Sequence, residues 1–370
     1  MKRLKGIDIF RGLIMVLMVF VHLRDWWLIG GADAAFSNIT RPFIDRTFAP
    51  AFMFSAGLST FISYNNRIKR ISEEYSYRTI KNEYLFRAII IGIIGLIYNI
   101  FVAIMKSDPS LIWTWFMLFS IGFSLLMAWP LLKVSKIIKI AVGLMIIIAN
   151  EILFWLLWPF RGQLNFNGIM YHIFFNSLYL DPILESFFFL LIGIVIGELI
   201  VDIFNIKDQS ERRRALKKKL LFPSLSIGIC LIIYTFVFIF PLFFNNEGFY
   251  WIYFSMGMCL IINSVLLTLE EYDVFEKKKS YKFLFYFSYY SLTVYLSHYL
   301  FFFFFLGQLN VYTLCLVILV TTILYGLILR VLYFKLGPKI SLKIQIARFA
   351  IYLAAKFNNK KRSINERKIR

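Results

Sequence analysis

Charged residues are scarce in this chain, in which only 17% of 370 residues are Asp, Glu, Lys or Arg. An average soluble domain has about 25% charged and roughly 45–50% apolar residues, whereas 60% of the residues here are hydrophobic. So low a charge content excludes a disordered chain and a coiled coil, and it argues against a soluble globular enzyme. The same composition is typical of a protein with many membrane spans.

Cysteine and histidine are also rare, with three residues of each. The cysteines Cys230, Cys259 and Cys315 all lie in apolar runs, which indicates small core residues rather than a disulfide framework or a thiolate metal site. The histidines lack the His-x-x-x-His spacing of a helical zinc site, so we predict no metal centre.

Acidic residues are about half as frequent as basic ones, and 21 Asp+Glu against 41 Lys+Arg leave a formal charge of +20. Ten stretches approach the length of about 20 apolar residues that a membrane-spanning helix needs. They are 8–29, 45–64, 84–105, 112–132, 137–158, 182–204, 220–243, 249–269, 283–305 and 311–334. In the connections between them, 35 basic residues fall on one side and five on the other, with Arg11 inside the first stretch. By the positive-inside rule, both termini are then cytoplasmic.

The basic charge therefore indicates orientation in a membrane, and we expect contact with anionic lipid headgroups rather than with nucleic acid. The chain shows no repeat of fixed period and no low-complexity linker. We predict an all-α, multi-pass protein of the cell membrane, with one transmembrane domain over 1–335 and a basic cytoplasmic tail over 336–370. The oligomeric state stays open, and a homodimer is one of the options.

Four ionisable residues lie in the first stretch, and ionisable groups within a membrane span by default indicate a functional site. Asp8, Arg11, His22 and Asp25 fall within an arc of roughly 100° on a helix that turns about 100° per residue. At a rise of about 1.5 Å per residue, Arg11 and His22 are ~16 Å apart along the helix axis. The structural alternative pairs Asp8 with Arg11 at the interface and lets His22 cap a neighbouring backbone group.

His298 lies late in another outward-going stretch, so the predicted topology places it near the outer face, as it does His22. A neutral imidazole is the side chain best suited to accept a proton near pH 7. Taken alone, His298 is explained at least as well as a hydrogen-bonded packing residue. Seven of the eight tryptophans, including Trp26, lie near the outer side, either as an aromatic belt or as a stacking platform for a sugar.

The first stretch carries a family motif. It runs from Lys5-Gly6-Ile7-Asp8-Ile9-Phe10-Arg11-Gly12 to Val21-His22 and resembles the first helix of the heparan-alpha-glucosaminide N-acetyltransferase-like membrane proteins. The spacing of Arg, ten residues and His is also similar to the motif of related acyltransferases that modify bacterial surface polysaccharides. Further similar stretches are Pro50–Gly57 with Arg67 just after it, Arg87-Ala88 leading to Gly95–Asn99, and Ser291–His298.

This resemblance implies transfer of an acyl group, expected to be acetyl, from cytoplasmic acyl-CoA to a sugar amine or hydroxyl on the extracytoplasmic side. The acceptor would be a glycan or a lipid-linked sugar. Because the guanidinium fork suits phosphate, Arg11, Arg67 and Arg87 are expected to bind the acetyl-CoA co-substrate, with Asp8 beside Arg11.

His22 is expected to take the proton from the acceptor, and Asp25 or His298 to orient His22 or replace it. In the animal lysosomal enzymes of the family, an asparagine stands at the position of His22 and the proposed catalytic histidine lies in the following luminal loop. Residues 30–44 of this chain contain no histidine, which favours the arrangement based on His22.

Two other functions fit the same residues. A transporter or flippase would use Asp8, Arg11, Glu151 and His22 as a substrate or proton path, although the chain lacks the inverted repeats common in transporters. A non-catalytic partner in a glycan-assembly complex would bind no acyl-CoA.

Overall fold

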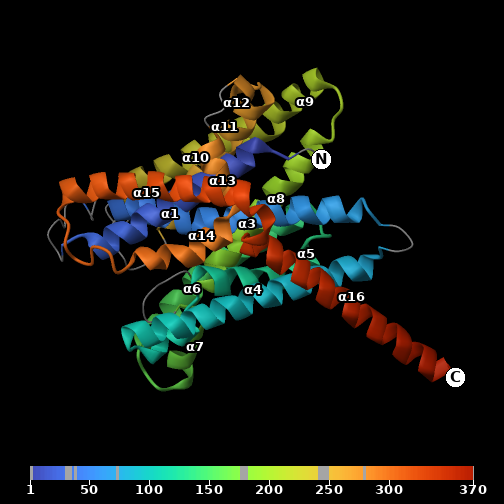
Figure 1. Cartoon of the computed structure of the whole chain (residues 1–370), viewed down its shortest axis with the longest axis horizontal. Helices are drawn as coiled ribbons and strands as arrows, with labels where there is room; N and C mark the ends of the chain where they lie inside the picture. The colour runs from blue at the N-terminus through green and yellow to red at the C-terminus, as the bar shows by residue number, and fades with distance from the viewer. Residues whose placement is uncertain are drawn as a thin grey trace. The chain divides into compact units, whose positions relative to one another are not determined.

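The computed structural model describes residues 3–29, 36, 40–71, 75–175, 182–240, 250–277 and 281–369 (Figure 1). The chain is 86% helical and the described ranges contain no strand, which confirms the predicted all-α class. The helices are α1 (Lys5–Trp27), α3 (Arg46–Ile68), α4 (Tyr77–Lys106), α5 (Met117–Leu131), α6 (Lys136–Leu157), α7 (Phe166–Phe174), α8 (Ile183–Phe204), α9 (Gln209–Leu216), α10 (Phe222–Tyr234), α11 (Trp251–Glu271), α12 (Val274–Lys277), α13 (Lys282–Tyr289), α14 (Ser291–Ser297), α15 (Val311–Lys335) and α16 (Leu342–Ile369).

Eight of the ten predicted spans are confirmed as helical segments long and apolar enough to cross a membrane. In the described part of the chain these are Lys5–Trp27, Tyr77–Lys106, Pro109–Leu131, Lys136–Phe160, Ile183–Phe204, Gln209–Ile239, Trp251–Glu271 and Val311–Lys335. The protein is therefore a multi-pass membrane protein. The cytoplasmic location of the two termini stays a prediction.

The other two predicted spans differ from the eight. The stretch 45–64 forms α3, a single helix of 23 residues that contains Pro50 and is less apolar than the others. The stretch 283–305 is broken into α13, α14 and the 3-10 turn His298–Phe301, which places His298 at a helix end.

Two compact units make up the chain. Unit 1 comprises Met1–Ser55 and Asp202–Gln345, and unit 2 comprises Ala56–Val201 and Ile346–Arg370. The single transmembrane domain over 1–335 stays a prediction. The predicted tail begins with the turn Gly337–Lys339 and continues as α16, so most of it is helical.

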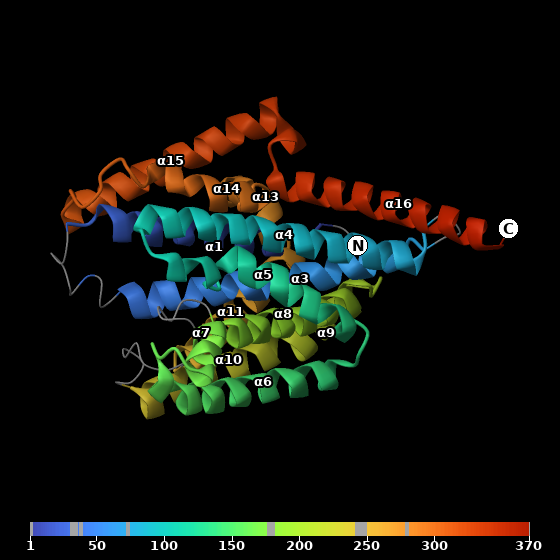
Figure 2. The same ribbon diagram turned by 90° about the horizontal axis from the view of Figure 1, so that it is seen from below.

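In unit 1, α1 packs against α11, α13, α14 and α15 (Figures 1 and 2). Met15, Val19 and Leu23 form a fully buried stripe on α1. Gly12, next to Arg11 in the family motif, lies where α1 meets α13, and a Cβ atom there would stand only 2.1 Å from the Leu284 carbonyl oxygen. This close approach of two backbones explains why the motif carries glycine after Arg11.

In unit 2, α4 packs along α5, and α6 contacts α7 (Figures 1 and 2). Gly57, in the second family stretch, faces α8, where a Cβ atom would lie 1.9 Å from the Leu190 carbonyl oxygen. The contact holds this part of α3 close to α8. Arg67 follows ten residues later on the same helix.

Candidate active site

Asp8 and Arg11 lie one turn apart near the start of α1 in unit 1. The buried Asp8 carboxylate accepts hydrogen bonds from Arg3 Nε at 2.5 Å and from Ser288 Oγ of α13 at 3.1 Å. Arg11 Nη1 lies 3.9 Å from the same carboxylate. Asp8 is therefore a counter-ion of two arginines, which suits a role in orienting Arg11 better than direct contact with an anionic ligand.

His22, near the end of α1, and His298, which follows α14, lie together in unit 1. Their ring centroids are 4.8 Å apart with an interplanar angle of 31°. The Trp26 indole stacks on His298 at 5.5 Å and 8°, and on His22 at 5.3 Å and 23°. The Tyr299 ring lies 4.6 Å from His298. The fold thus brings two predicted catalytic histidines from distant parts of the sequence into one aromatic group, here called the histidine cluster (His22, Trp26, His298 and Tyr299).

The His298 imidazole is fully buried. It interacts with the backbone of Val294 and Tyr295, one turn earlier on α14, and among the described residues no side chain forms a hydrogen bond with its ring nitrogens. A role as a packing residue bound to its own helix therefore stays an alternative to a catalytic role of His298.

Backbone hydrogen bonds join the end of α1 to the segment that follows His298. The amides of residues 307–309 donate to the carbonyl oxygens of Trp26 and Trp27 at 2.8–3.1 Å. The Trp27 indole nitrogen donates to the Phe301 carbonyl at 2.9 Å. Gly307 adopts a φ of +63°, a conformation that favours glycine. These bonds fix His22 and His298 on two segments that are tied to each other.

Asp25, the third predicted catalytic residue, lies against Arg24. Arg24 Nε and Nη2 donate to Asp25 Oδ1 at 3.0 and 2.8 Å, and its two terminal nitrogens bind the Asp45 carboxylate at 2.9 and 2.6 Å. Asp45 is the last residue of the helical turn Arg41–Asp45, which precedes α3. The structure therefore makes Asp25 a counter-ion of Arg24.

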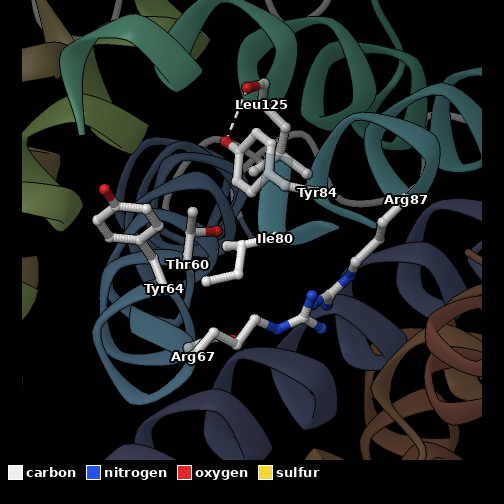
Figure 3. A pocket seen from close by; sticks show the side chains of 8 residues that line it. Thr60, Tyr64, Arg67, Ile80, Tyr84, Arg87 and Leu125 are labelled. Atoms are coloured by element: carbon white, nitrogen blue, oxygen red, sulfur yellow. Dashed lines mark hydrogen bonds between the residues drawn. The ribbon is translucent and has the colours of Figure 1, made fainter. Parts of the chain in front are cut away.

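Arg67 and Arg87 line one small pocket in unit 2, here called the arginine pocket (Figure 3). Arg67 comes from the end of α3 and Arg87 from α4, and Figure 3 shows their side chains pointing toward one another. The remaining lining residues are Thr60, Ser63, Tyr64, Ile80, Tyr84 and Leu125. The cavity measures about 30 Å³, which is room for one or two water molecules and too little for a nucleotide phosphate chain.

One of these two arginines, Arg67, already forms an ion pair with a carboxylate. Glu83 of α4, buried except for 5% of its side chain, accepts a hydrogen bond from Arg67 Nη1 at 2.5 Å. Tyr75 donates to the same Glu83 oxygen at 2.9 Å. Burial, together with this hydrogen bond, raises the pKa of Tyr75 to about 12, so the phenol stays a donor at any physiological pH. An anionic ligand of Arg67 would compete with Glu83.

Several residues in and around the histidine cluster and the arginine pocket are not among the site residues predicted from the sequence. Glu83 and Arg87 are four residues apart on α4, a spacing that puts them on one helix face and could have indicated an ion-pair network. Arg24 is also absent from the predicted site, although it lies fully buried in the last turn of α1. The hydroxyl groups of Thr60 and Ser63 carry no signal in the sequence. Within the described ranges, no group of three or more His, Cys, Asp or Glu could hold a metal ion.

The family described as "Heparan-alpha-glucosaminide N-acetyltransferase, catalytic" matches residues 3–239, well over half of the chain. A search of curated proteins finds no match to the chain. The matched part includes Arg11, His22, Arg67 and Arg87, whereas His298 lies beyond it. This multi-pass membrane protein therefore belongs to the heparan-alpha-glucosaminide N-acetyltransferase catalytic family, a family of membrane acetyltransferases.

Proposed function

We propose that the protein transfers an acetyl group from cytoplasmic acetyl-CoA to a sugar amine or hydroxyl on the extracytoplasmic side of the cell membrane. The observation that carries the proposal is the pairing of His22 with His298 in the histidine cluster. The cluster lies about three helical turns from Arg11 along α1, as the family motif requires. Membership of the acetyltransferase family supports the reaction class.

His22 is the proposed general base, because it completes the Arg, ten residues, His spacing of the related acyltransferases and is only half-buried. In this reaction the nitrogen or oxygen of the acceptor attacks the thioester carbonyl carbon, and His22 takes the proton that the acceptor loses. The carbon–sulfur bond breaks, and the imidazolium returns the proton to the departing thiolate. The imidazole is thus neutral at the beginning and at the end of the cycle.

His298 and Trp26 support this step from two sides. The Trp26 indole stacks on both imidazoles and limits the orientations that either ring can adopt. The ring nitrogens of His298, which bind no other side chain among the described residues, offer one further proton donor or acceptor next to His22. We assign His298 to the orientation of the acceptor or of His22, in a site that is organised before the substrate binds.

The arginine pocket is the proposed binding place for donor phosphates. Guanidinium groups bind phosphate bidentately, and charge-assisted bonds of this kind are about twice as strong as neutral ones. Because the cavity is small and Glu83 holds Arg67, binding would widen the pocket and release the Glu83–Arg67 pair. Arg11 is assigned to the same co-substrate on the ground of the family motif.

Sidedness rests on the distribution of charge. The excess of basic residues on one side of the predicted spans supports a cytoplasmic donor site and an extracytoplasmic acceptor. We propose a cell-surface glycan or a lipid-linked sugar as the acceptor, reached from the membrane that surrounds the protein.

The test is acetyl transfer by the purified protein in liposomes, with labelled acetyl-CoA on one side and amino sugars or oligosaccharides on the other. We expect labelled product from the wild type and a loss of at least about 100-fold in His22→Ala, because a general base contributes about 10²–10⁴ to the rate. His172→Ala, on α7 of unit 2, is the matched control and is expected to keep its activity.

Two results would contradict the proposal. Undiminished transfer by His22→Ala would remove His22 from its role. Flux of a sugar across the liposome membrane without any acyl donor, in a protein that forms no labelled product, would support the transporter alternative.

A further inference from the structure

A cavity of about 220 Å³ lies in unit 1 at the start of α1, and the proposed function leaves it unused. This cavity, here called the N-terminal cavity, is much larger than the arginine pocket of about 30 Å³. One water molecule needs about 10–15 Å³ of such space, so the N-terminal cavity has room for a small organic ligand. Its lining residues include Arg3, Lys5, Gln209, Arg212, Glu270 and Glu271.

The two glutamates in the wall of the cavity already have partners within the chain. Glu270 accepts hydrogen bonds from the backbone amides of Lys5 and Gly6 at 2.8 and 2.7 Å, and so caps the first turn of α1. Glu271, buried except for 5% of its side chain, accepts hydrogen bonds from Arg212 Nε at 3.0 Å. Both carboxylates therefore serve as internal acceptors, and a cationic ligand would find their oxygens already bound.

Arg3 differs from these residues, because its guanidinium is held in place and still has donors to offer. Its Nε donates to the Asp8 carboxylate at 2.5 Å, and its Cζ lies 4.6 Å from the centroid of the Phe285 ring. Among the described residues, none accepts a hydrogen bond from the terminal nitrogens of Arg3. The side chain is 54% exposed, so a ligand can reach it. A guanidinium fixed in this way presents two parallel donors to one anion.

The segment that borders the cavity on the side of α9 is strongly basic. Residues 207–219 contain seven basic and two acidic residues. Asp273, a further carboxylate of the wall, is exposed and lies 4.0 Å from Arg213 of this segment. Such an excess of positive charge raises the local concentration of anions. A phosphate monoester carries about 1.5–2 negative charges at pH 7 and three acceptor oxygens, so it suits these surroundings better than a carboxylate does.

We propose that the N-terminal cavity is a binding site for a phosphate monoester, which the terminal nitrogens of Arg3 hold while its Nε stays bound to Asp8. The site lies at the ends of three membrane-spanning helices, because Lys5 begins α1, Phe204 ends α8 and Glu271 ends α11. At such a place the phosphate can belong to the headgroup of an anionic lipid or to a soluble ester.

The test measures the melting temperature of the full-length protein in nanodiscs of neutral lipid, titrated with glycerol 3-phosphate or, at equal ionic strength, with acetate. We expect glycerol 3-phosphate to raise the melting temperature more than acetate does, because a ligand of the folded state stabilises it. Arg3→Gln should need a roughly tenfold higher concentration for the same shift, because charge-assisted bonds are lost. Arg214→Gln, which removes an equal charge from an exposed residue of α9, is the matched control and should respond like the wild type.

Nanodiscs that contain phosphatidic acid distinguish the two sources of the phosphate. For a lipid ligand, this lipid alone raises the melting temperature of the wild type but not of Arg3→Gln, and glycerol 3-phosphate then adds little. For a soluble ligand, the response to glycerol 3-phosphate is the same in both kinds of nanodisc and again depends on Arg3.

Gln209→Glu keeps the proposal testable if Arg3→Gln fails to fold. It places a negative charge on an exposed residue of the wall and should weaken the response to glycerol 3-phosphate. Equal responses of Arg3→Gln and Arg214→Gln in both kinds of nanodisc would overturn the proposal. So would an unchanged response of Gln209→Glu, or an acetate response as large as that to glycerol 3-phosphate. No acetyl transfer is measured, so the result is independent of the proposed function.

Discussion

The histidine cluster of unit 1 and the arginine pocket of unit 2 differ in whether their buried polar side chains are paired with other side chains. In the histidine cluster, the buried ring nitrogens of His298 bind no side chain among the described residues and meet only the backbone of their own helix. In the arginine pocket, Arg67 is bound to Glu83, and Glu83 is bound in turn to Tyr75. A buried polar group left without a partner costs about 1–3 kcal/mol, so the ion pair of Arg67 with Glu83 stabilises the arginine pocket in a way that no side-chain pair of His298 matches.

This difference indicates how the histidine cluster and the arginine pocket would each bind a ligand. At the histidine cluster, the half-buried His22 is the ring that a substrate can approach, whereas the fully buried His298 acts on a substrate only through its neighbours or after a local movement. The arginine pocket must exchange an internal carboxylate for an external anion, so the affinity of a ligand there reflects the difference between two ion pairs. The two places are therefore expected to respond to mutation in opposite ways, one in rate and the other in affinity.

The largest effect that would sharpen this comparison is expected for His298→Phe. Phenylalanine keeps a ring that stacks on Trp26 but removes both nitrogens, so we expect kcat to fall by about 10²-fold. Because His298 binds no side chain among the described residues, thermal stability should change little. Enzyme assays combined with thermal unfolding would check this, and a lower melting temperature with unchanged kcat would show that His298 only packs.

The next effect concerns Arg67→Ala, which should leave kcat within about twofold while raising KM for acetyl-CoA. A lost charge-assisted bond of about 1.5–2 kcal/mol corresponds to a rise of roughly 10–30-fold. Arg70→Ala, an exposed arginine one turn later along the chain, is the matched control and should keep the wild-type KM. Equal KM values for the two variants would argue against donor binding in the arginine pocket.

A smaller effect of opposite direction is expected for Glu83→Gln. Removing the carboxylate leaves Arg67 partly buried without its counter-ion, so the melting temperature of the free protein should fall by a few degrees. Coenzyme A should then raise the melting temperature of the variant more than that of the wild type, because no internal carboxylate competes for Arg67. A thermal-shift titration measures both, and an equal ligand response in the two proteins would contradict the exchange.

The smallest effect is expected for Tyr75→Phe, which removes one hydrogen bond to Glu83 worth about 1 kcal/mol. Since the pKa of Tyr75 is raised to about 12, its stabilising contribution is complete below pH 10 and is lost only as the pH rises through 12. The difference in stability between variant and wild type should therefore be constant from pH 7 to about 9.5. A difference that declines within this range would show that the phenol ionises earlier.

The sequence predicts part of the fold well because most spans are long apolar runs, and eight of them form helical segments long and apolar enough to cross a membrane. The break at Tyr290 and His298 has no such signal, since the surrounding run is as apolar as an unbroken span. The grouping of Arg67 with Arg87 followed from the family resemblance, but the Glu83 carboxylate between α3 and α4 becomes visible only when the two helices pack together.

The histidine cluster shows the same limit. Topology placed His22 and His298 near one face of the membrane, yet contact between their rings depends on how α1 and α14 pack, which hydropathy does not encode. Asp25 was expected beside His22 because helical spacing brings it within reach. Asp25 instead binds the Arg24 guanidinium. Arg24 is held in place by hydrogen bonds to Thr40 and Asp45, which lie on a segment distant in sequence.

The hydrogen bonds between the end of α1 and residues 301–309 have a consequence for biosynthesis. Trp27 and the Phe301 carbonyl that it contacts are separated by 274 positions. At a synthesis rate of about 5–20 residues per second, roughly 15–55 s pass between the appearance of His22 at the ribosome and that of His298. During this time α1 exists without the second histidine of the proposed site. On the proposed function, the nascent protein becomes active only when the α14 segment has been made, late in translation.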